Sequence, residues 1–216
     1  MKWSRLSVFD LDHTLVKGNC SFSFCLYLVS KNVLPAYSLL YALYYYVRHH
    51  IFGLSLEKLH NHIFQLLLRG RSLPQLEEHV EVFVDTYLDK AINASTLLRL
   101  RLAQHLGHYT LILSNSPSFL VAAFAKCLGV DDWKATRYGV DQEKNLSHID
   151  FILQGKEKAD YVNELACRLH ISKEDVTAYS DSYLDLPFLL TAGTPVVVNP
   201  DRKLRKYSES HDWTVL

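Results

Sequence analysis

The segment Leu6-Ser7-Val8-Phe9-Asp10-Leu11-Asp12-His13-Thr14-Leu15 decides the fold, because a short apolar run ends there in two carboxylates. The run predicts a buried strand whose carboxyl end carries Asp10 and Asp12, which is where open α/β sheets hold their ligands. Two acids this close repel each other, so a cation is the natural occupant between them. On its own the pair also fits a strand that runs into an acidic turn. A second acid pair, Asp181 and Asp185, follows another apolar run and favours a site.

Composition indicates a globular protein of one medium domain, or a core domain with a small insertion. The chain has 216 residues, of which 49% are apolar. Lys plus Arg and Asp plus Glu both number 23, so we expect no nucleic-acid partner. The cysteines form no Cys-x-x-Cys pair and fit buried thiols in a reducing compartment: Cys20, Cys25, Cys127 and Cys167. The N-terminus lacks the pattern of a signal peptide, and a cytoplasmic protein is expected.

Strand–helix alternation in the second half predicts a parallel sheet with crossover helices. Expected strands cover residues 6–10, 109–113, 176–180 and 195–199, with a hairpin over 134–140 and 148–153. Expected helices cover 55–70, 72–89, 95–106, 117–129, 157–170 and 183–191. We therefore predict an α/β protein with a Rossmann-like parallel sheet core and helices on both faces. Residues 1–16 and 93–216 form this core domain, and residues 17–92 form an inserted all-helical domain.

One helical stretch raises the question of a membrane. Residues 33–47 are apolar except for Ser38, and Arg48, His49 and His50 follow them. Five tyrosines crowd the stretch: Tyr37, Tyr41, Tyr44, Tyr45 and Tyr46. It is shorter than the ~20 apolar residues that span a bilayer. Two interpretations stay open. The stretch could be a buried helix or an oligomer contact. It could also be an interfacial helix that brings the protein to a membrane surface, since tyrosines flanked by cations suit the headgroup layer.

Four polar clusters recur at strand ends or helix starts. Singly they have ordinary explanations, because Ser114 could cap a helix, Lys158 could be solvated and Asp181 could be an N-cap. The clusters are Asp10, Asp12 and Thr14; Ser114, Asn115 and Ser116; Lys158; and Asp181 with Asp185. In this order they resemble the four motifs of the haloacid dehalogenase (HAD) superfamily of phosphatases. The helical insertion after the first motif looks like a C1-type cap. Asp185-Leu186-Pro187 and Asn199-Pro200-Asp201 look like subfamily IB, the phosphoserine-phosphatase-like branch.

This resemblance implies a phosphomonoester hydrolase that works through an aspartyl-phosphate intermediate. Asp10 would be the nucleophile. Asp12 would protonate the leaving oxygen and then deprotonate the attacking water. Lys158 would neutralise charge on Asp10 and on the phosphoryl group, with Lys156 as a less favoured alternative.

The resemblance also implies a cofactor and a phosphate site. Mg²⁺ would be held by Asp10, by the backbone carbonyl of Asp12 and by Asp181. Ser114 and Asn115, together with Lys158, would bind the phosphoryl oxygens. Thr14 and Asp185 would support the site, Asp185 through either the metal or Lys158.

Two departures from the family pattern concern the substrate. Phosphoserine phosphatases usually follow the motif-two serine with two glycines, whereas Asn115-Ser116-Pro117 stands here. They also place a glutamate soon after the first motif to hold the amino group, but residues 16–30 contain no acid. An unpaired ammonium in an apolar pocket is costly, so phosphoserine is a poor candidate and a phosphate with an apolar or lipid tail a better one.

Several alternatives remain open at this level. The substrate could instead be a small metabolite such as phosphoserine, histidinol phosphate or a sugar phosphate. The protein could be a phosphotransferase of the same fold that uses an acceptor other than water. It could also be a binding module that keeps the fold without catalysis, although every expected catalytic side chain is present.

Overall fold

The computed structural model describes residues 3–216, apart from the side chains of residues 49 and 50, so the predictions for His49 and His50 lie outside it. Within this part of the chain, seven strands form one sheet in the order β4-β3-β2-β1-β5-β6-β7. The strands are β1 (Leu6–Asp10), β2 (Tyr109–Pro117), β3 (Asp132–Val140), β4 (Leu146–Phe151), β5 (Val176–Ser180), β6 (Thr194–Val197) and β7 (Thr214–Val215). All neighbours are parallel except β3 and β4, which form the expected hairpin.

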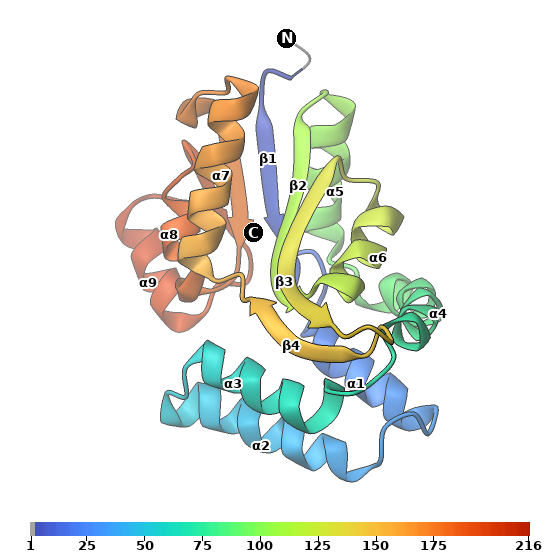
Figure 1. Cartoon of the computed structure of the whole chain (residues 1–216). Coiled ribbons are helices and arrows are strands. Elements are labelled where there is room, and N and C mark those ends of the chain that lie inside the picture. Colours follow the sequence, from blue (N-terminus) through green and yellow to red (C-terminus); the bar gives the residue numbers. More distant parts are fainter. Residues whose placement is uncertain (1–2) are drawn as a thin grey trace.

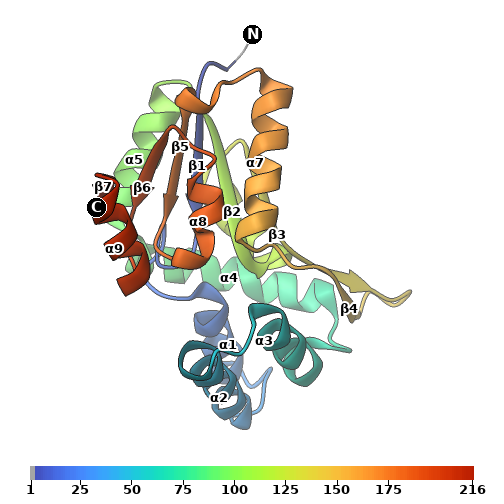
Figure 2. The same ribbon diagram turned by 90° about the vertical axis from the view of Figure 1, so that its left-hand side faces the viewer.

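The central strand β1 explains why the opening segment is apolar throughout. All five of its residues are buried, and it lies between β2 and β5. Leu6 and Val8 belong to the apolar cluster on one face of the sheet, and Phe9 belongs to the cluster on the other. Figure 2 shows helices on both faces, with α5 (Ala94–His105) on one side and α7 (Gly155–Leu169) on the other. A strand covered on both faces reads as a continuous apolar run.

Four helices are inserted between β1 and α5. They are α1 (Cys20–Ser30), α2 (Tyr37–Phe52), α3 (Leu56–Ile63) with a following π-helical turn (Phe64–Leu68), and α4 (Leu73–Ala91). Figure 1 places α1 to α3 beyond the carboxyl ends of the strands, while α4 packs against α6 (Ser118–Leu128). The chain leaves and re-enters the core at one place, where the Lys17 amide donates to Ala91 O (2.6 Å) and the Asn93 amide donates to Leu15 O (2.9 Å).

Packing joins the inserted helices to the sheet. Phe24 of α1 and Phe83 of α4 lie with ring centroids 5.2 Å apart, and both belong to the cluster that contains Phe9. Asn19 caps α1 by accepting a hydrogen bond from the Phe22 amide (2.8 Å), which satisfies one of the exposed donors of the first turn. The start of α1 is therefore fixed close to the end of β1.

The predicted fold class is confirmed, with several corrections at element ends. β2 runs on to Pro117, and a 3₁₀ turn (Tyr183–Asp185) followed by α8 (Leu186–Leu189) replaces the single helix expected there. Helix α9 (Arg202–Ser210) and strand β7 had no prediction. The expectation of buried thiols is right for Cys20 and Cys25 and wrong for Cys127 and Cys167, which are exposed. No helix among residues 3–216 is long and apolar enough to span a bilayer.

Candidate active site

A buried lysine joins two of the predicted acids. Lys158 Nζ lies 2.7 Å from Asp10 Oδ1 and 2.7 Å from Asp185 Oδ2. The Ser180 hydroxyl also donates to Asp185 Oδ2 (2.8 Å), and all these side chains are buried. Strand β1, helix α7 and the Tyr183–Asp185 turn after β5 thus contribute to one charged cluster at the carboxyl edge of the sheet. Of the two supporting roles expected for Asp185, this geometry shows the contact with Lys158.

Local sequence determines where Lys158 lies. A capping box of Gln154 and Glu157 starts α7, so the lysine sits in its first turns. The chain needs a glycine at position 155, because a Cβ there would overlap the backbone carbonyl oxygen of Leu184. Helix α7 can therefore approach the Tyr183–Asp185 turn closely enough for Lys158 to reach Asp185.

Burial perturbs the carboxyl groups of this cluster. Burial and the nearby Asp185 raise the pKa of Asp10 to about 7, although Lys158 opposes the shift. Burial, Asp10 and Asp185 together raise the pKa of Asp181 to about 8. Burial alone would lower the pKa of Lys158, but Asp10 and Asp185 raise it above its usual value, so the side chain stays an ammonium. The site holds more negative charge than one lysine neutralises.

These carboxylates fit a hard cation. Among the described residues no group of three His, Cys, Asp or Glu side chains forms a metal site. Asp10 and Asp185 nevertheless raise the pKa of Asp181, which shows that the negative charges of the cluster are not fully compensated. The Thr14 hydroxyl lies 3.5 Å from Asp181 Oδ1 and orients that carboxylate. Two carboxylates and a backbone carbonyl of Asp12 would give the oxygen donors that Mg²⁺ prefers, with water completing its shell.

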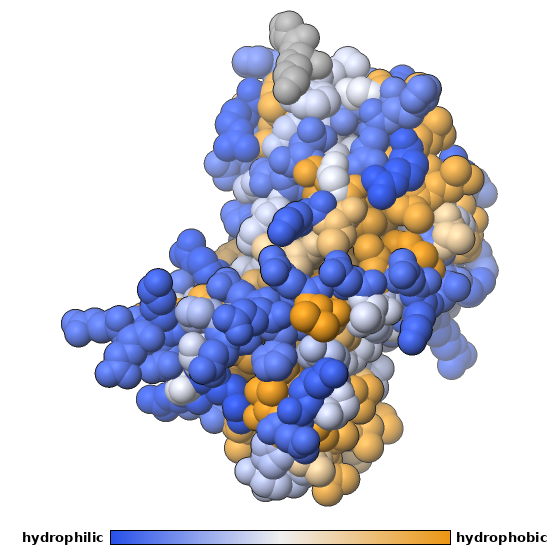
Figure 3. All heavy atoms as spheres, turned by 90° about the vertical axis from the view of Figure 1, so that its right-hand side faces the viewer, coloured by the Kyte–Doolittle hydropathy of each residue, from blue (hydrophilic) through white to orange (hydrophobic). Residues whose placement is uncertain are grey.

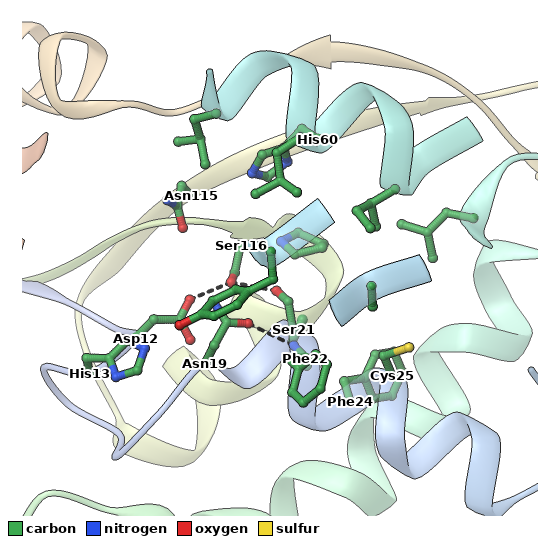
Figure 4. A pocket seen from close by; sticks show the side chains of 18 of the residues that line it. Asp12, His13, Asn19, Ser21, Phe22, Phe24, Cys25, His60, Asn115 and Ser116 are labelled. Carbon is green, nitrogen blue, oxygen red and sulfur yellow. Dashed lines mark hydrogen bonds between the residues drawn. The ribbon is translucent and has the colours of Figure 1, made fainter. Parts of the chain in front are cut away.

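The Asp12 carboxylate accepts hydrogen bonds from two donors that are not part of the Asp10–Lys158–Asp185 cluster. The Cys20 amide donates to Asp12 Oδ1 (2.6 Å), and the Ser116 hydroxyl donates to Asp12 Oδ2 (2.6 Å). Figure 4 shows Ser116 between Asp12 and Ser21, with the dashed bonds that link them. The first turn of α1 therefore reaches the predicted general acid directly.

A bulge at the end of β2 places the two predicted phosphate ligands of this strand, Ser114 and Asn115, in different positions. The pairing of β2 with β3 shifts register between Ser114 and Pro117, so Asn115 and Ser116 are the extra residues. Asn115 and Ser116 line the cavity beside the acids. Ser114 is fully buried behind it, where its hydroxyl accepts a hydrogen bond from the Ser116 amide (3.1 Å). The structure thus brings Asn115 to the cavity with Lys158 and the acids, and Ser114 one layer deeper.

A cavity of about 270 Å³ extends from the acids into the inserted helices. At the sheet end it is lined by Asp10, Asp12, Lys158, Asp181 and Asp185. Its far end is lined mainly by apolar side chains, which include Phe24, Leu28, Leu34, Ala42, Leu59, Ile63, Leu67 and Phe119. No other Asp or Glu lines it among the residues that the structure describes.

The structure also shows site residues that the sequence interpretation did not single out. His60 Nδ1 and the Tyr138 hydroxyl lie 3.3 Å apart, and both residues line the cavity. Ser180 and the Cys20 amide engage acids of the site, as described above. Ser180 stands next to Asp181, and that adjacency is the one signal that could have marked it. His60 lies within the inserted helices, and its spacing gave no such signal.

Comparison with known proteins supports one family. The model of the haloacid dehalogenase-like hydrolases matches residues 7–190. A putative hydrolase, ML2424, of Mycobacterium leprae is 28% identical over 96% of this chain and 70% of its own length. Phosphoserine phosphatase SerB1 of Mycobacterium tuberculosis is 28% identical over 96% of this chain and 68% of its own. A histidinol-phosphatase of Neisseria meningitidis is 27% identical over 98% of both chains.

Solved structures agree with this at the level of fold. A protein of unknown function from Bordetella pertussis has a TM-score of 0.86 at 21% identity, covering 99% of this chain and 98% of its own. A phosphoserine phosphatase solved as an analogue of its phospho-aspartyl intermediate has a TM-score of 0.71 at 17% identity, covering 95% and 91%. The expected phosphoserine-phosphatase-like fold is confirmed. With a family model that spans most of the chain, this protein belongs to the haloacid dehalogenase-like hydrolases.

Proposed function

We propose that the protein is a Mg²⁺-dependent phosphomonoester hydrolase that forms an aspartyl-phosphate on Asp10. The observation that carries the proposal is the buried contact of Asp10 with Lys158 beside Asp181, at the polar end of a cavity. Phosphatases among the relatives support the reaction class. In this proposal residues 17–92 serve as a C1-type cap over a core of residues 1–16 and 93–216.

The arrangement accounts for two successive displacements. The Asp10 carboxylate attacks phosphorus, the P–O bond to the leaving group breaks, and Asp12 gives that oxygen a proton. Asp12 then takes a proton from water, which attacks the phosphorus and releases phosphate and the Asp10 carboxylate. Lys158 and Asn115, which line the cavity, stabilise charge on the phosphoryl oxygens. Mg²⁺ held by Asp10, Asp181 and the Asp12 carbonyl would screen the nucleophile from the phosphate dianion.

The cavity favours a substrate with an apolar tail. Beyond the acids that surround the phosphate site, its described lining offers no carboxylate that could pair with an ammonium group. Its far end consists mainly of leucine, phenylalanine and other apolar side chains, which suit an alkyl or acyl chain. A lipid phosphate is therefore the proposed substrate class. A small-metabolite phosphatase is the second candidate, because relatives are named for phosphoserine and histidinol phosphate.

Removing the metal should make stability depend on pH through Asp181 and Asp10. The pKa of Asp181 rises from 3.8 to about 8, and that of Asp10 rises from 3.8 to about 7. Between about pH 4 and about pH 8 the native state therefore binds more protons than the unfolded state. The free energy of unfolding of the metal-free protein should therefore fall as pH rises from about 4 to 8. Mg²⁺ should restore stability at the upper end of this range.

Urea unfolding at several pH values, with EDTA or with Mg²⁺, measures this prediction. Asp181→Asn should flatten the pH dependence and should lose most of the stabilisation by Mg²⁺. Asp160→Asn, at an exposed position of α7, serves as the control and should behave like the wild type. An equal response to Mg²⁺ in the wild type and in Asp181→Asn would show that Asp181 is not a ligand.

The outer face of α2 is the proposed contact with a membrane. Leu40, Ile51 and Phe52 are 70% or more exposed, and Tyr37, Tyr41, Leu43 and Tyr44 are exposed with them. Figure 3 shows apolar side chains at the surface at the bottom of the molecule, where Figure 1 places the inserted helices α1 to α3. The sequence has no Asp or Glu between Asp12 and Glu57, whereas it has Lys17, Lys31 and Arg48. This charge suits an anionic lipid surface and disfavours an isologous contact with a second copy, in which cation would meet cation.

Vesicle flotation tests this contact. The wild type should float with vesicles that contain an anionic phospholipid and much less with neutral vesicles, because apolar burial and charge act together. Leu40→Asp should reduce flotation several-fold. Val82→Asp, at a 53% exposed position of α4, is the matched control and should leave it unchanged. A wild-type dimer that Leu40→Asp dissociates, with no flotation, would make α2 an oligomer contact instead.

A further inference from the structure

Ser116 lies in the bulge at the end of β2, and its side chain has a defined set of partners. Its hydroxyl donates to Asp12 Oδ2 (2.6 Å) and lies 2.7 Å from the Ser21 hydroxyl. Its backbone amide donates to the Ser114 hydroxyl (3.1 Å). With 2% of its surface exposed, the residue has little access to water that could replace these bonds.

Proton counting gives this network a direction. A serine hydroxyl carries one proton, and that of Ser116 is used on Asp12. Ser21 must therefore donate its own proton to Ser116, as does the Cys20 thiol at 3.4 Å. The bonds run from the first turn of α1 through Ser116 to the Asp12 carboxylate. Asp12 also accepts from the Cys20 amide, so both of its oxygens are held by groups that the start of α1 provides or contacts.

We propose that Ser116 is a positioning residue that orients Asp12 for proton transfer and links that orientation to the placement of α1. The inference rests on the proposed phosphatase function, in which Asp12 exchanges a proton with the leaving group and with water. A glycine at this position could not make the bond. The hydroxyl therefore gives the Asn115-Ser116-Pro117 sequence a role in the reaction, and Ser116 acts through Asp12 without being a catalytic residue itself.

The choice of leaving group separates this role from a merely structural one. An alkoxide is a poor leaving group and depends on the proton from Asp12, whereas 4-nitrophenolate leaves without protonation. In the first step, which kcat/KM reports, a misplaced Asp12 should therefore slow cleavage of an alkyl phosphate much more than cleavage of 4-nitrophenyl phosphate. The second step, in which Asp12 takes a proton from water, is common to both substrates and affects kcat alone. General acid–base catalysis contributes roughly 10²–10⁴-fold, which bounds the expected effect.

The experiment compares kcat and KM of the wild type, Ser116→Ala and Ser116→Thr on both phosphates with Mg²⁺ present. We expect Ser116→Ala to lower kcat/KM for the alkyl phosphate by about 10- to 100-fold, with kcat/KM for 4-nitrophenyl phosphate within about threefold. Ser116→Thr keeps the hydroxyl and should recover most of the rate. Ser7→Ala is the matched control. Ser7 lies in β1, is also 2% exposed, and has its hydroxyl hydrogen-bonded to His108 (2.9 Å) and not to an acid of the site.

The outcomes separate the two levels of the proposal. An equal loss of kcat/KM on both substrates, or a loss matched by Ser7→Ala, would overturn the positioning role while leaving the phosphatase intact. A wild type that hydrolyses neither phosphate would overturn the proposed function, and this inference with it. A selective loss on the alkyl phosphate that Ser116→Thr repairs would support both.

Discussion

Asp10→Asn should abolish hydrolysis of phosphomonoesters, with kcat reduced by about 10⁴-fold or more, as for other nucleophile substitutions. A neutral amide is a far weaker nucleophile than a carboxylate. The fold should survive, because Lys158 keeps its 2.7 Å contact with Asp185 and the substitution removes a charge from a crowded site. Steady-state rates with Mg²⁺, measured beside thermal unfolding, check both statements.

Asp160→Asn is the control for the removal of a carboxylate as such. Asp160 forms an ion pair with Lys156 (3.4 Å) at the exposed surface of α7 and has no contact with Lys158 there, so its loss should leave kcat unchanged. A folded Asp10→Asn protein that retains a substantial share of wild-type activity would rule out Asp10 as the nucleophile.

Lengthening the apolar tail of a phosphate substrate should raise kcat/KM by orders of magnitude until the cavity is full. Each buried methylene contributes about 0.8 kcal/mol, so four of them would give about 3 kcal/mol, or roughly 200-fold. Short phosphates should still turn over slowly, because the chemistry takes place at the polar end of the cavity. A series of monoalkyl phosphates, assayed below the concentrations at which they form micelles, measures the increment.

Blocking the cavity tests where the tail lies. Ala42 lines it from the inner side of α2, and Ala42→Phe should remove most of the chain-length dependence while sparing short phosphates. Leu40→Phe adds the same ring on the outer side of the helix, where Leu40 is 70% exposed, and should change little. Equal efficiency for long and short chains in the wild type would make the apolar lining ordinary packing and favour the small-metabolite candidate.

The sequence was informative about the fold because buried strands and helices leave recognisable patterns of apolar residues. The apolar run of residues 6–10 and the run of 176–180 are central strands covered on both faces, and both were predicted at their observed bounds. The 3₁₀ turn that begins at Tyr183 was missed, since a short turn and a helix start carry similar residues. Exposure of Cys127 and Cys167 was missed for a related reason: a helix has two faces, and a single cysteine does not report which one it occupies.

The site was predictable where the family motifs name a residue, and much less so for the contacts between residues. Lys158 meets Asp10 across 148 positions and Ser116 meets Asp12 across 104, and no local pattern encodes such distances. The resemblance left two roles for Asp185, and only the three-dimensional arrangement shows its bond to Lys158. The bulge that turns Asn115 toward the cavity depends on the pairing of β2 with β3, which spacing along one strand does not reveal.

Chemical trapping of the covalent intermediate tests the central claim most directly. The wild type would be mixed with substrate and Mg²⁺, quenched during turnover, and treated with borohydride, which reduces an aspartyl phosphate to homoserine. Peptide mass spectrometry should then find homoserine at position 10, and none without substrate. Turnover without homoserine at position 10, or with the modification at another aspartate, would contradict the account.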